Sequence, residues 1–283
     1  MTLNVLLLVG MFAASTGPAE PEAVSVRELL QTAQRQSSAG DAAGALETLR
    51  RARIAAPNSE EVLSAFAQVS LAAHLPIPAI ATLDALTRLC PDVAQYHYLL
   101  GVALMQIGDM GLAVDSLKAA ERLEPDRVLT LIALGLALNA RKLYADARPF
   151  LLRALELEPE SAEASAALAE SDEGVGDLQS ADTHARRALA RSMMNSTANL
   201  VLGLLSMKQE RYRDAREAFE KVVAADPSSS RAHYQLSLAC ARLGDDACAQ
   251  QQVETYKQML RETEERVKQL RMQTGLSSGE NRR

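Results

Sequence analysis

The chain has 283 residues, a net charge of −6 and 48% hydrophobic residues, a composition typical of folded globular proteins. The mildly acidic balance gives no support to a nucleic-acid-binding protein, because phosphate recognition needs clustered lysine and arginine. Tryptophan is absent and aromatic residues make up 4%, which argues against a β-sandwich and suits closely packed helices.

The chain begins with an almost wholly apolar segment, Leu3–Ala14, followed by small residues. The segment is too short to span a bilayer comfortably, and its outline is that of a secretory signal peptide, although no lysine or arginine precedes it. We therefore expect residues 1–19 to direct export to the periplasm or the medium, with cleavage between Ser15 and Ala19. The alternatives are an uncleaved membrane anchor or a misassigned start codon; without a functional signal the protein is cytoplasmic.

From Val26 onward the chain repeats itself with a period of 34 residues. Five of its ten prolines follow this period, and Met193 stands where a sixth is expected; these prolines are Pro57, Pro91, Pro125, Pro159 and Pro227. A fixed period of this length indicates stacked copies of one supersecondary unit. The predicted units are 26–59, 60–93, 94–127, 128–161, 162–195, 196–229 and 230–261.

Two places in the unit carry small residues. The twentieth place is alanine in all seven units: Ala45, Ala79, Ala113, Ala147, Ala181, Ala215 and Ala249. The eighth place is also small: Ala33, Ala67, Gly101, Gly135, Ala169, Gly203 and Ser237. Small residues on both sides of a turn are what two closely packed antiparallel helices require.

The turn inside the unit is marked by a Gly-Asp pair in units one, three, five and seven, for example Gly108-Asp109. Glycine can end the first helix in a left-handed conformation, and aspartate can cap the next helix. Units two, four and six have His74-Leu75, Lys142-Leu143 and Glu210-Arg211 in its place.

This pattern resembles the tetratricopeptide repeat. Unit three shows its signature residues most clearly: Leu100-Gly101, Ala113, Leu117, Ala120 and Pro125. The resemblance covers Val26 to about Leu260 and implies an all-α superhelix, a solenoid of tandem antiparallel helix pairs. Residues 262–283 are predicted to form a charged helical extension, which can cap the last unit, and then a disordered tail after Thr274.

Unit five departs most from the pattern. It has Ser165 where an aromatic residue is expected, Asp172 at an apolar position, and Met193 in place of the proline. Gly174 and Gly176 add backbone freedom. We therefore predict that unit five is the least stable part of the stack.

No catalytic or metal-binding constellation is present in the sequence. His97 and His233 occupy the same repeat position, which favours a packing role for both. No His-x-x-x-His or Cys-x-x-Cys pair and no glycine-rich phosphate loop occurs, so we predict neither a metal site nor a cofactor. The protein is therefore predicted not to be an enzyme.

Cys240 and Cys248 lie on either side of the last turn, each about one helical turn from it. An antiparallel helix pair would bring them within reach of a disulfide, which in an exported protein would fasten the terminal unit. Because the spacing alone does not show how the helices align, two separate buried thiols are slightly favoured.

The resemblance implies that the first helix of each unit lines a concave groove through its second, fifth, ninth and twelfth places. The lining predicted in this way is mostly apolar and contains one polar residue, Asn139. Its other members are Tyr98, Val102, Met105, Leu129, Ile132, Leu136, Leu200, Leu204, Met207, Tyr234 and Leu238. Gln95, Thr197, Arg231 and Ala241 also fall at these places. An apolar surface that faces water usually marks a partner site, and the alternative is burial by the curving superhelix.

Glu163, Glu170 and Glu173 of unit five fall on the same groove. They favour a protein partner whose apolar segment is flanked by lysine or arginine, such as an amphipathic helix or an extended peptide. We therefore predict a protein-interaction scaffold or assembly factor of the cell envelope, which could also serve a larger enzyme complex. The alternative is a carrier or sensor of a small hydrophobic ligand or lipid. The groove that this family uses for acidic peptide ends needs a Lys, Arg and Asn cluster that is missing here.

Overall fold

The computed structural model describes residues 25–274, with side chains described for residues 25–265. These residues divide into two compact units, 25–73 and 74–274, and each is described by itself. The division falls within the second predicted repeat, at the turn before Pro76. The predicted signal segment, residues 1–19, and the predicted tail after Thr274 lie outside the described part of the chain.

Residues 25–274 form fourteen α-helices and no strand, as the all-α prediction requires, and each odd-numbered helix begins at the first residue of a predicted repeat. The helices are α1 (Val26–Ser38), α2 (Ala42–Ala55), α3 (Glu60–Ala72), α4 (Pro76–Leu89), α5 (Ala94–Gln106), α6 (Met110–Leu123), α7 (Val128–Ala140), α8 (Tyr144–Leu157), α9 (Ala162–Val175), α10 (Leu178–Arg191), α11 (Ser196–Lys208), α12 (Tyr212–Ala225), α13 (Ser230–Arg242) and α14 (Asp246–Thr274).

The first unit consists of α1, α2 and α3, which pack around a small apolar core. Ser25 begins α1 in a capping box, in which its hydroxyl accepts from the backbone N–H of Glu28 and its own N–H donates to the Glu28 carboxylate. In the core, Phe66 is 3% exposed, and the guanidinium of Arg53 lies 5.0 Å from the centre of its ring. This cation–π contact closes one side of the core.

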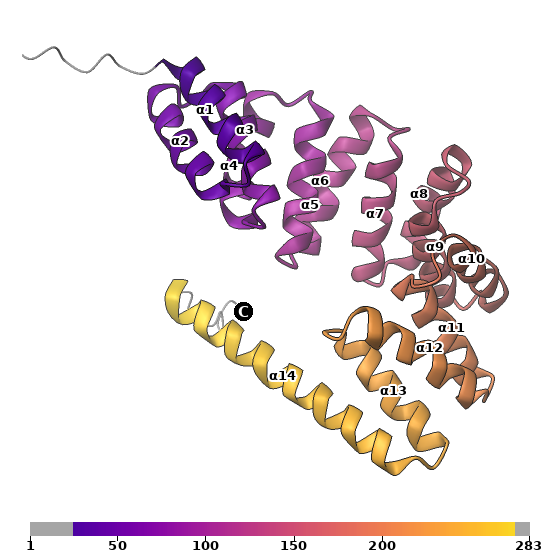
Figure 1. Ribbon diagram of the computed structural model, residues 1–283. Coiled ribbons are helices and arrows are strands. Elements are labelled where there is room, and N and C mark those ends of the chain that lie inside the picture. Colours follow the sequence, from indigo (N-terminus) through magenta and orange to yellow (C-terminus); the bar gives the residue numbers. More distant parts are fainter. Residues whose placement is uncertain (1–24, 275–283) are drawn as a thin grey trace, which may run out of the picture. The chain divides into compact units, whose positions relative to one another are not determined.

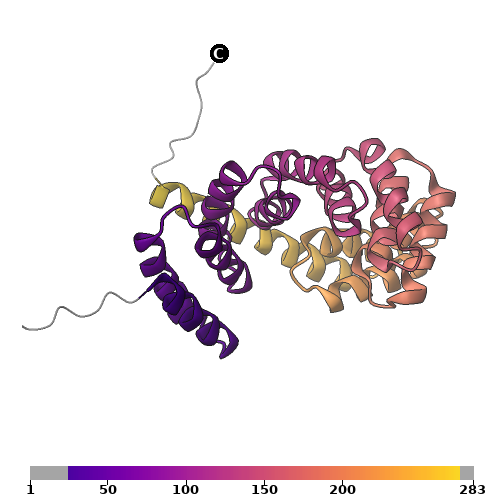
Figure 2. The same ribbon diagram turned by 90° about the horizontal axis from the view of Figure 1, so that it is seen from above.

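The second unit, α4–α14, is an all-α superhelix of tandem helix pairs. Each helix packs against the next one along the chain, and the pairs succeed one another in chain order (Figures 1 and 2). The odd-numbered helices also contact each other, α5 with α7, α7 with α9, α9 with α11 and α11 with α13. They therefore form a continuous layer, and this layer carries the predicted groove residues.

The small residues of the repeat lie where the two helices of a pair approach most closely. The alanine of the twentieth place is fully buried in the first six repeats, whereas Ala249 of the last repeat is half-buried because no further pair follows it. A Cβ atom added to Gly135 would lie 2.4 Å from the side chain of Leu151, and one added to Gly203 would lie 2.3 Å from the ring of Phe219. The helices thus pack at a distance that a larger side chain would prevent.

In all seven repeats, the turn between the two helices has a residue in the left-handed conformation at the same place. Glycine takes this conformation in the odd repeats, with φ between 74° and 89°, while His74, Lys142 and Glu210 take it with φ of 55°, 60° and 58°. At Gly108 the backbone forms the two hydrogen bonds of a Schellman motif, and Asp109 then caps α6. The fourth and sixth repeats form the same two hydrogen bonds at Lys142 and Glu210, without the Gly-Asp pair.

Replacing Lys142 with glycine is expected to raise the free energy of unfolding by about 0.5–1 kcal/mol. The left-handed conformation costs a non-glycine residue about 1–2 kcal/mol, part of which the greater chain entropy of glycine offsets. Urea denaturation followed by circular dichroism measures the change. The reverse replacement, Gly108→Lys, is the matched control and should destabilise; equal effects of the two substitutions would contradict the argument.

Polar residues at the fourth place of three repeats bind the connection that precedes them. A ring nitrogen of His97 lies 2.8 Å from the carbonyl oxygen of Pro91, and His233 makes the equivalent contact with Pro227 at 3.1 Å. Asn199 donates to the carbonyl oxygen of Met193 at 3.2 Å, although the proline is missing there. These contacts give the residues a structural role in joining successive repeats.

Cys240 of α13 and Cys248 of α14 form a disulfide, with their Cα atoms 5.8 Å apart. The slight preference for separate thiols is corrected here, because the structure supplies the alignment of the two helices that the spacing lacks. Since the last pair has a neighbouring pair on one side only, the cross-link fastens the end of the array.

Candidate functional site

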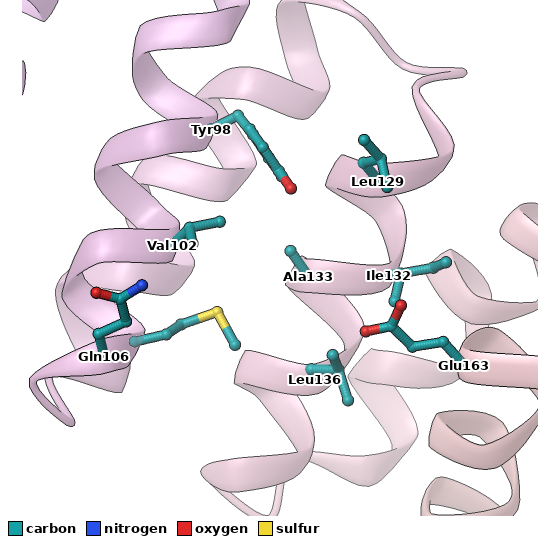
Figure 3. Close-up of a pocket in the computed structure, with 9 residues that line it drawn as sticks. Tyr98, Val102, Gln106, Leu129, Ile132, Ala133, Leu136 and Glu163 are labelled. Atoms are coloured by element: carbon teal, nitrogen blue, oxygen red, sulfur yellow. The ribbon is translucent and has the colours of Figure 1, made fainter. Parts of the chain in front are cut away.

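The layer of odd-numbered helices carries a pocket of about 380 Å³ between α5, α7 and α9. It is lined mainly by apolar side chains: Tyr98, Val102, Met105, Gln106, Leu129, Ile132, Ala133, Leu136 and Glu163. Seven of these nine residues belong to the predicted groove. Figure 3 shows side chains from α5 and α7 facing each other across the pocket, with Glu163 reaching in from α9.

The apolar floor and the rim of this pocket differ in exposure. Ile132 is 5% exposed and belongs to the core that α7, α8 and α9 share, whereas Leu129 is 55% exposed. An exposed leucine beside an apolar pocket leaves hydrophobic surface in contact with water. Among the side chains of the pocket, Leu129 is therefore the one whose burial by a partner would release the most hydrophobic free energy.

Two polar groups point into the pocket. In Figure 3 the hydroxyl of Tyr98 is directed toward α7, and the carboxylate of Glu163 is directed toward Ile132 and Leu136. Burial raises the pKa of Tyr98, the positive charge of Arg127 opposes the shift, and the negative charge of Glu163 adds to it. The Tyr98 hydroxyl therefore stays protonated at neutral pH and can both donate and accept a hydrogen bond.

Arg127 holds the ring of Tyr98 in place from outside the pocket. Its guanidinium lies 4.7 Å from the ring centre, donates to the side-chain carbonyl of Gln95, and lies 3.7 Å from the carboxylate of Glu124. The charge of Arg127 is thus matched within the chain, and the ring is fixed by the cation–π contact.

Glu163 differs from the other two groove glutamates. Its side chain is exposed and makes no hydrogen bond or ion pair with the residues that the structure describes. Glu170 instead accepts a hydrogen bond from Arg231 at 2.9 Å, and Glu173 accepts one from Lys208 at 2.7 Å. The prediction of three carboxylates that face a ligand is therefore corrected, because two of them are paired within the chain.

Asn139 does not line the groove, which corrects another predicted residue. It is 3% exposed, donates to the carbonyl oxygen of Ala167 at 2.8 Å, and accepts from the hydroxyl of Ser171 at 2.7 Å. Both partners belong to α9. A buried amide needs such partners, so Asn139 joins α7 to α9 and does not meet a ligand.

The predicted groove residues of α11 and α13 form no described pocket. Leu200, Leu204 and Met207 are half-buried against the core that α12 and α13 share. Tyr234 and Leu238 are exposed, at 43% and 38%, and the Tyr234 ring lies 5.3 Å from that of Tyr256 on α14. The structure thus gathers the α5 and α7 residues and Glu163 at one site and leaves the remaining ones elsewhere on the layer.

Sequence reasoning missed Gln106 and Ala133 as pocket residues. Gln106 is the last residue of α5, and Ala133 follows Ile132 on the pocket side of α7. Both lie next to groove places, so a wider window on the repeat could have included them. Lys208 was missed too, and no local signal identifies it because its partner is 35 residues away.

A buried polar cluster connects α8 of the fourth repeat with α9 and α10 of the fifth. Asp172 is fully buried; its Oδ2 lies 2.7 Å from Nδ1 of His184, and its Oδ1 lies 2.9 Å from Nε of Arg148. The Arg148 contact has the distance of an ion pair but a poor hydrogen-bond direction. Asp177 lies 3.8 Å from the same guanidinium. The pKa of Asp177 is lowered mainly by the hydrogen bonds from Ser180, with smaller contributions from Arg148 and His184.

The described residues offer neither a metal site nor a membrane-spanning helix. No group of three or more His, Cys, Asp or Glu side chains with the arrangement of a metal site occurs among them. Within the same part of the chain, no helix has the length and hydrophobicity that crossing a membrane requires.

Comparison with known proteins agrees with this architecture. Residues 79–128 and 200–251 match a family model described as tetratricopeptide repeat. No curated protein sequence matches the chain. A tetratricopeptide repeat protein from Parabacteroides merdae has a similar solved structure, with a TM-score of 0.70, 14% identity, and coverage of 83% of this chain and 93% of that one.

Two further solved structures show the same fold. The structure of pilF from Pseudomonas aeruginosa has a TM-score of 0.56 and 20% identity, and the match covers 74% of this chain and 94% of that one. That of MamA from Desulfovibrio magneticus RS-1 has a TM-score of 0.53 and 22% identity, with coverage of 60% and 96%. At these identities the likeness shows the fold alone. The two matched segments, the period of 34 residues and the paired helices together show that the chain is built of tetratricopeptide repeats.

Proposed function

We propose that this protein is an interaction scaffold that binds an apolar segment of a partner protein in the pocket between α5, α7 and α9. The observation that supports the proposal is the combination of the exposed Leu129, the apolar lining and the unpaired carboxylate of Glu163. A leucine-sized side chain of the partner would bury against Leu129 and Leu136. A neighbouring lysine or arginine would pair with Glu163.

The lining of the site favours a peptide over an enzyme substrate. The pocket combines apolar side chains with one tyrosine hydroxyl, one carboxylate and one amide, and it holds no nucleophile beside a base. We further propose that the N-terminal segment directs export, so that the scaffold works in the cell envelope. The disulfide between Cys240 and Cys248 supports this location, because disulfides persist in oxidising compartments.

Photocrosslinking from the pocket tests the proposed function. The photoreactive residue p-benzoylphenylalanine replaces Val102, and mass spectrometry identifies the crosslinked segment. Leu129→Asp is expected to weaken binding about tenfold or more, because it removes apolar contact worth about 1.5–3 kcal/mol and places a charge there. The crosslink yield should fall accordingly.

The matched control is Leu112→Asp on α6, because Leu112 is as exposed as Leu129, at 55%, and lies on the other helix layer. Crosslinks should persist in this variant. Equal yields in both variants would refute the pocket as the binding site. Recovery of a lipid or another small apolar molecule from the pocket, with no protein segment attached, would select the carrier or sensor alternative.

A further inference from the structure

Two ion pairs connect the odd-numbered helices of the last three repeats. Nζ of Lys208, at the end of α11, lies 2.7 Å from Oε1 of Glu173, and Nη1 of Arg231, at the start of α13, lies 2.9 Å from Oε1 of Glu170. Both glutamates lie on α9, in the same helix layer as the pocket. We call these two contacts the α9 clasp.

The clasp is unusual for a solenoid because one of its pairs passes over a repeat. Helix pairs in a solenoid normally contact only their neighbours. Glu170 belongs to the fifth repeat and Arg231 to the seventh, 61 residues further along the chain. The layer must therefore curve enough in this region to bring the start of α13 to the middle of α9.

The two carboxylates of the clasp are largely withdrawn from solvent. The side chains of Glu170 and Glu173 are 19% and 15% exposed, compared with 45% and 46% for Arg231 and Lys208. The ring of Tyr144, the first residue of α8, packs against Gly174 of α9. Burial raises the pKa of Tyr144, and the charges of Glu170 and Glu173 raise it further while Arg231 lowers it. Both carboxylates thus lie in one shielded environment, with a cation bound to each.

The clasp decides how much negative charge the groove presents. Glu163, Glu170 and Glu173 lie on the same helix, and Glu163 is about 10 Å from Glu170 along the axis at 1.5 Å per residue. Without Lys208 and Arg231, all three would form an acidic row next to the pocket. With them, Glu163 is the one groove glutamate of the described chain that has no bound cation.

We propose that Lys208 and Arg231 remove a preference for polybasic ligands by occupying Glu173 and Glu170, so that one basic residue next to its apolar anchor is all that a partner segment needs. A polybasic segment gains nothing further, because the carboxylates that its additional charges would need are already paired. This inference rests on the proposed function of the pocket. The two cations thus act by removing the extra attraction that a polybasic ligand would otherwise have, which is one way to build specificity.

Two fluorescein-labelled peptides test the inference. One has a pair of leucines followed by a single lysine, and the other has the same leucines followed by four lysines. Fluorescence anisotropy at low ionic strength gives the Kd of each peptide. The wild-type protein is expected to bind both peptides within about threefold of each other. Lys208→Gln/Arg231→Gln should bind the polybasic peptide about tenfold more tightly and leave the single-lysine peptide unchanged.

The matched control removes the same net charge from the other helix layer. Lys118→Gln/Arg122→Gln changes two exposed cations of α6 and should not discriminate between the peptides. Adding Glu170→Gln and Glu173→Gln to the Lys208→Gln/Arg231→Gln protein should abolish the gain. Circular dichroism melts establish that each variant is folded at the temperature of measurement.

The outcomes separate the two proposals. Binding of both peptides by wild type, with no gain in Lys208→Gln/Arg231→Gln or with the same gain in the α6 control, overturns the inference and leaves the proposed function standing. Binding of neither peptide by any variant overturns both. A gain that persists after Glu170 and Glu173 are neutralised also overturns the inference, since another acidic surface must then be responsible.

Discussion

Replacing Arg148 with methionine is expected to lower the free energy of unfolding by about 2–3 kcal/mol. Methionine keeps most of the apolar stem but leaves the fully buried carboxylate of Asp172 with the imidazole of His184 as its remaining side-chain partner. Removing one partner of a fully buried ion pair costs roughly 3–5 kcal/mol, and the lower figure here reflects the 37% exposure of Arg148. Urea denaturation measures the loss, and hydrogen exchange should localise it to α8, α9 and α10.

The double replacement Arg148→Met/Asp172→Leu is the control for this prediction. Leucine at position 172 matches Leu104 and Leu138, which occupy the same place in the third and fourth repeats. Replacing both members of a buried ion pair with apolar residues is often neutral or stabilising. The double variant should therefore recover most of the stability. A double variant as unstable as Arg148→Met alone would show that packing, and not the uncompensated charge, causes the loss.

This prediction also bears on the stability of the fifth repeat. Ser165, Asp172 and Met193 predict that it is the least stable repeat, and this stays a prediction. The structure supplies compensating contacts, because Asp172 is paired with Arg148 of the fourth repeat and His184 of the fifth, and Glu170 and Glu173 are paired with later repeats. Arg148→Met removes the contact between Arg148 and Asp172 and leaves the other contacts in place. Hydrogen exchange in this variant therefore also reports how much that contact contributes to the stability of the fifth repeat.

Gly203→Ala is expected to destabilise the protein by about 1–3 kcal/mol, the usual cost of adding a methyl group to a filled interface. The new Cβ would lie 2.3–2.8 Å from three atoms of the Phe219 ring, which is fully buried and cannot turn aside without moving α12. The loss is measured by urea denaturation. An unchanged midpoint would mean that α11 and α12 can separate without cost.

Phe219→Leu should rescue this variant. In the first repeat an alanine at the eighth place, Ala33, shares a core cluster with a leucine at the twenty-fourth, Leu49. Gly203→Ala/Phe219→Leu reproduces that pairing. The double variant should be more stable than the sum of the two single changes predicts, and the double-mutant cycle gives the coupling. Simple additivity would contradict direct contact between the two positions.

Much of the candidate site could be located from the sequence because it follows the repeat. Tyr98, Val102 and Met105 recur at places that the period assigns to one face of the first helix, and Leu129, Ile132 and Leu136 do so one repeat later. Asn139 obeys the same spacing but is buried, because its place lies beside α9 where the groove ends. Spacing assigns a face to a side chain, and the packing of the neighbouring helix decides whether that face is open.

The sequence by itself determined the all-α class, the period and the start of every odd-numbered helix, because turn residues, small contact residues and apolar positions are local signals repeated seven times. The tertiary structure alone decided which charges pair, whether the cysteines align and which carboxylate stays open to a partner. Glu170 and Arg231 are 61 residues apart, and their distance depends on the rise and twist accumulated over two repeats. Sequence spacing does not contain that geometry, so Glu163 is distinguished from Glu170 and Glu173 only in the folded chain.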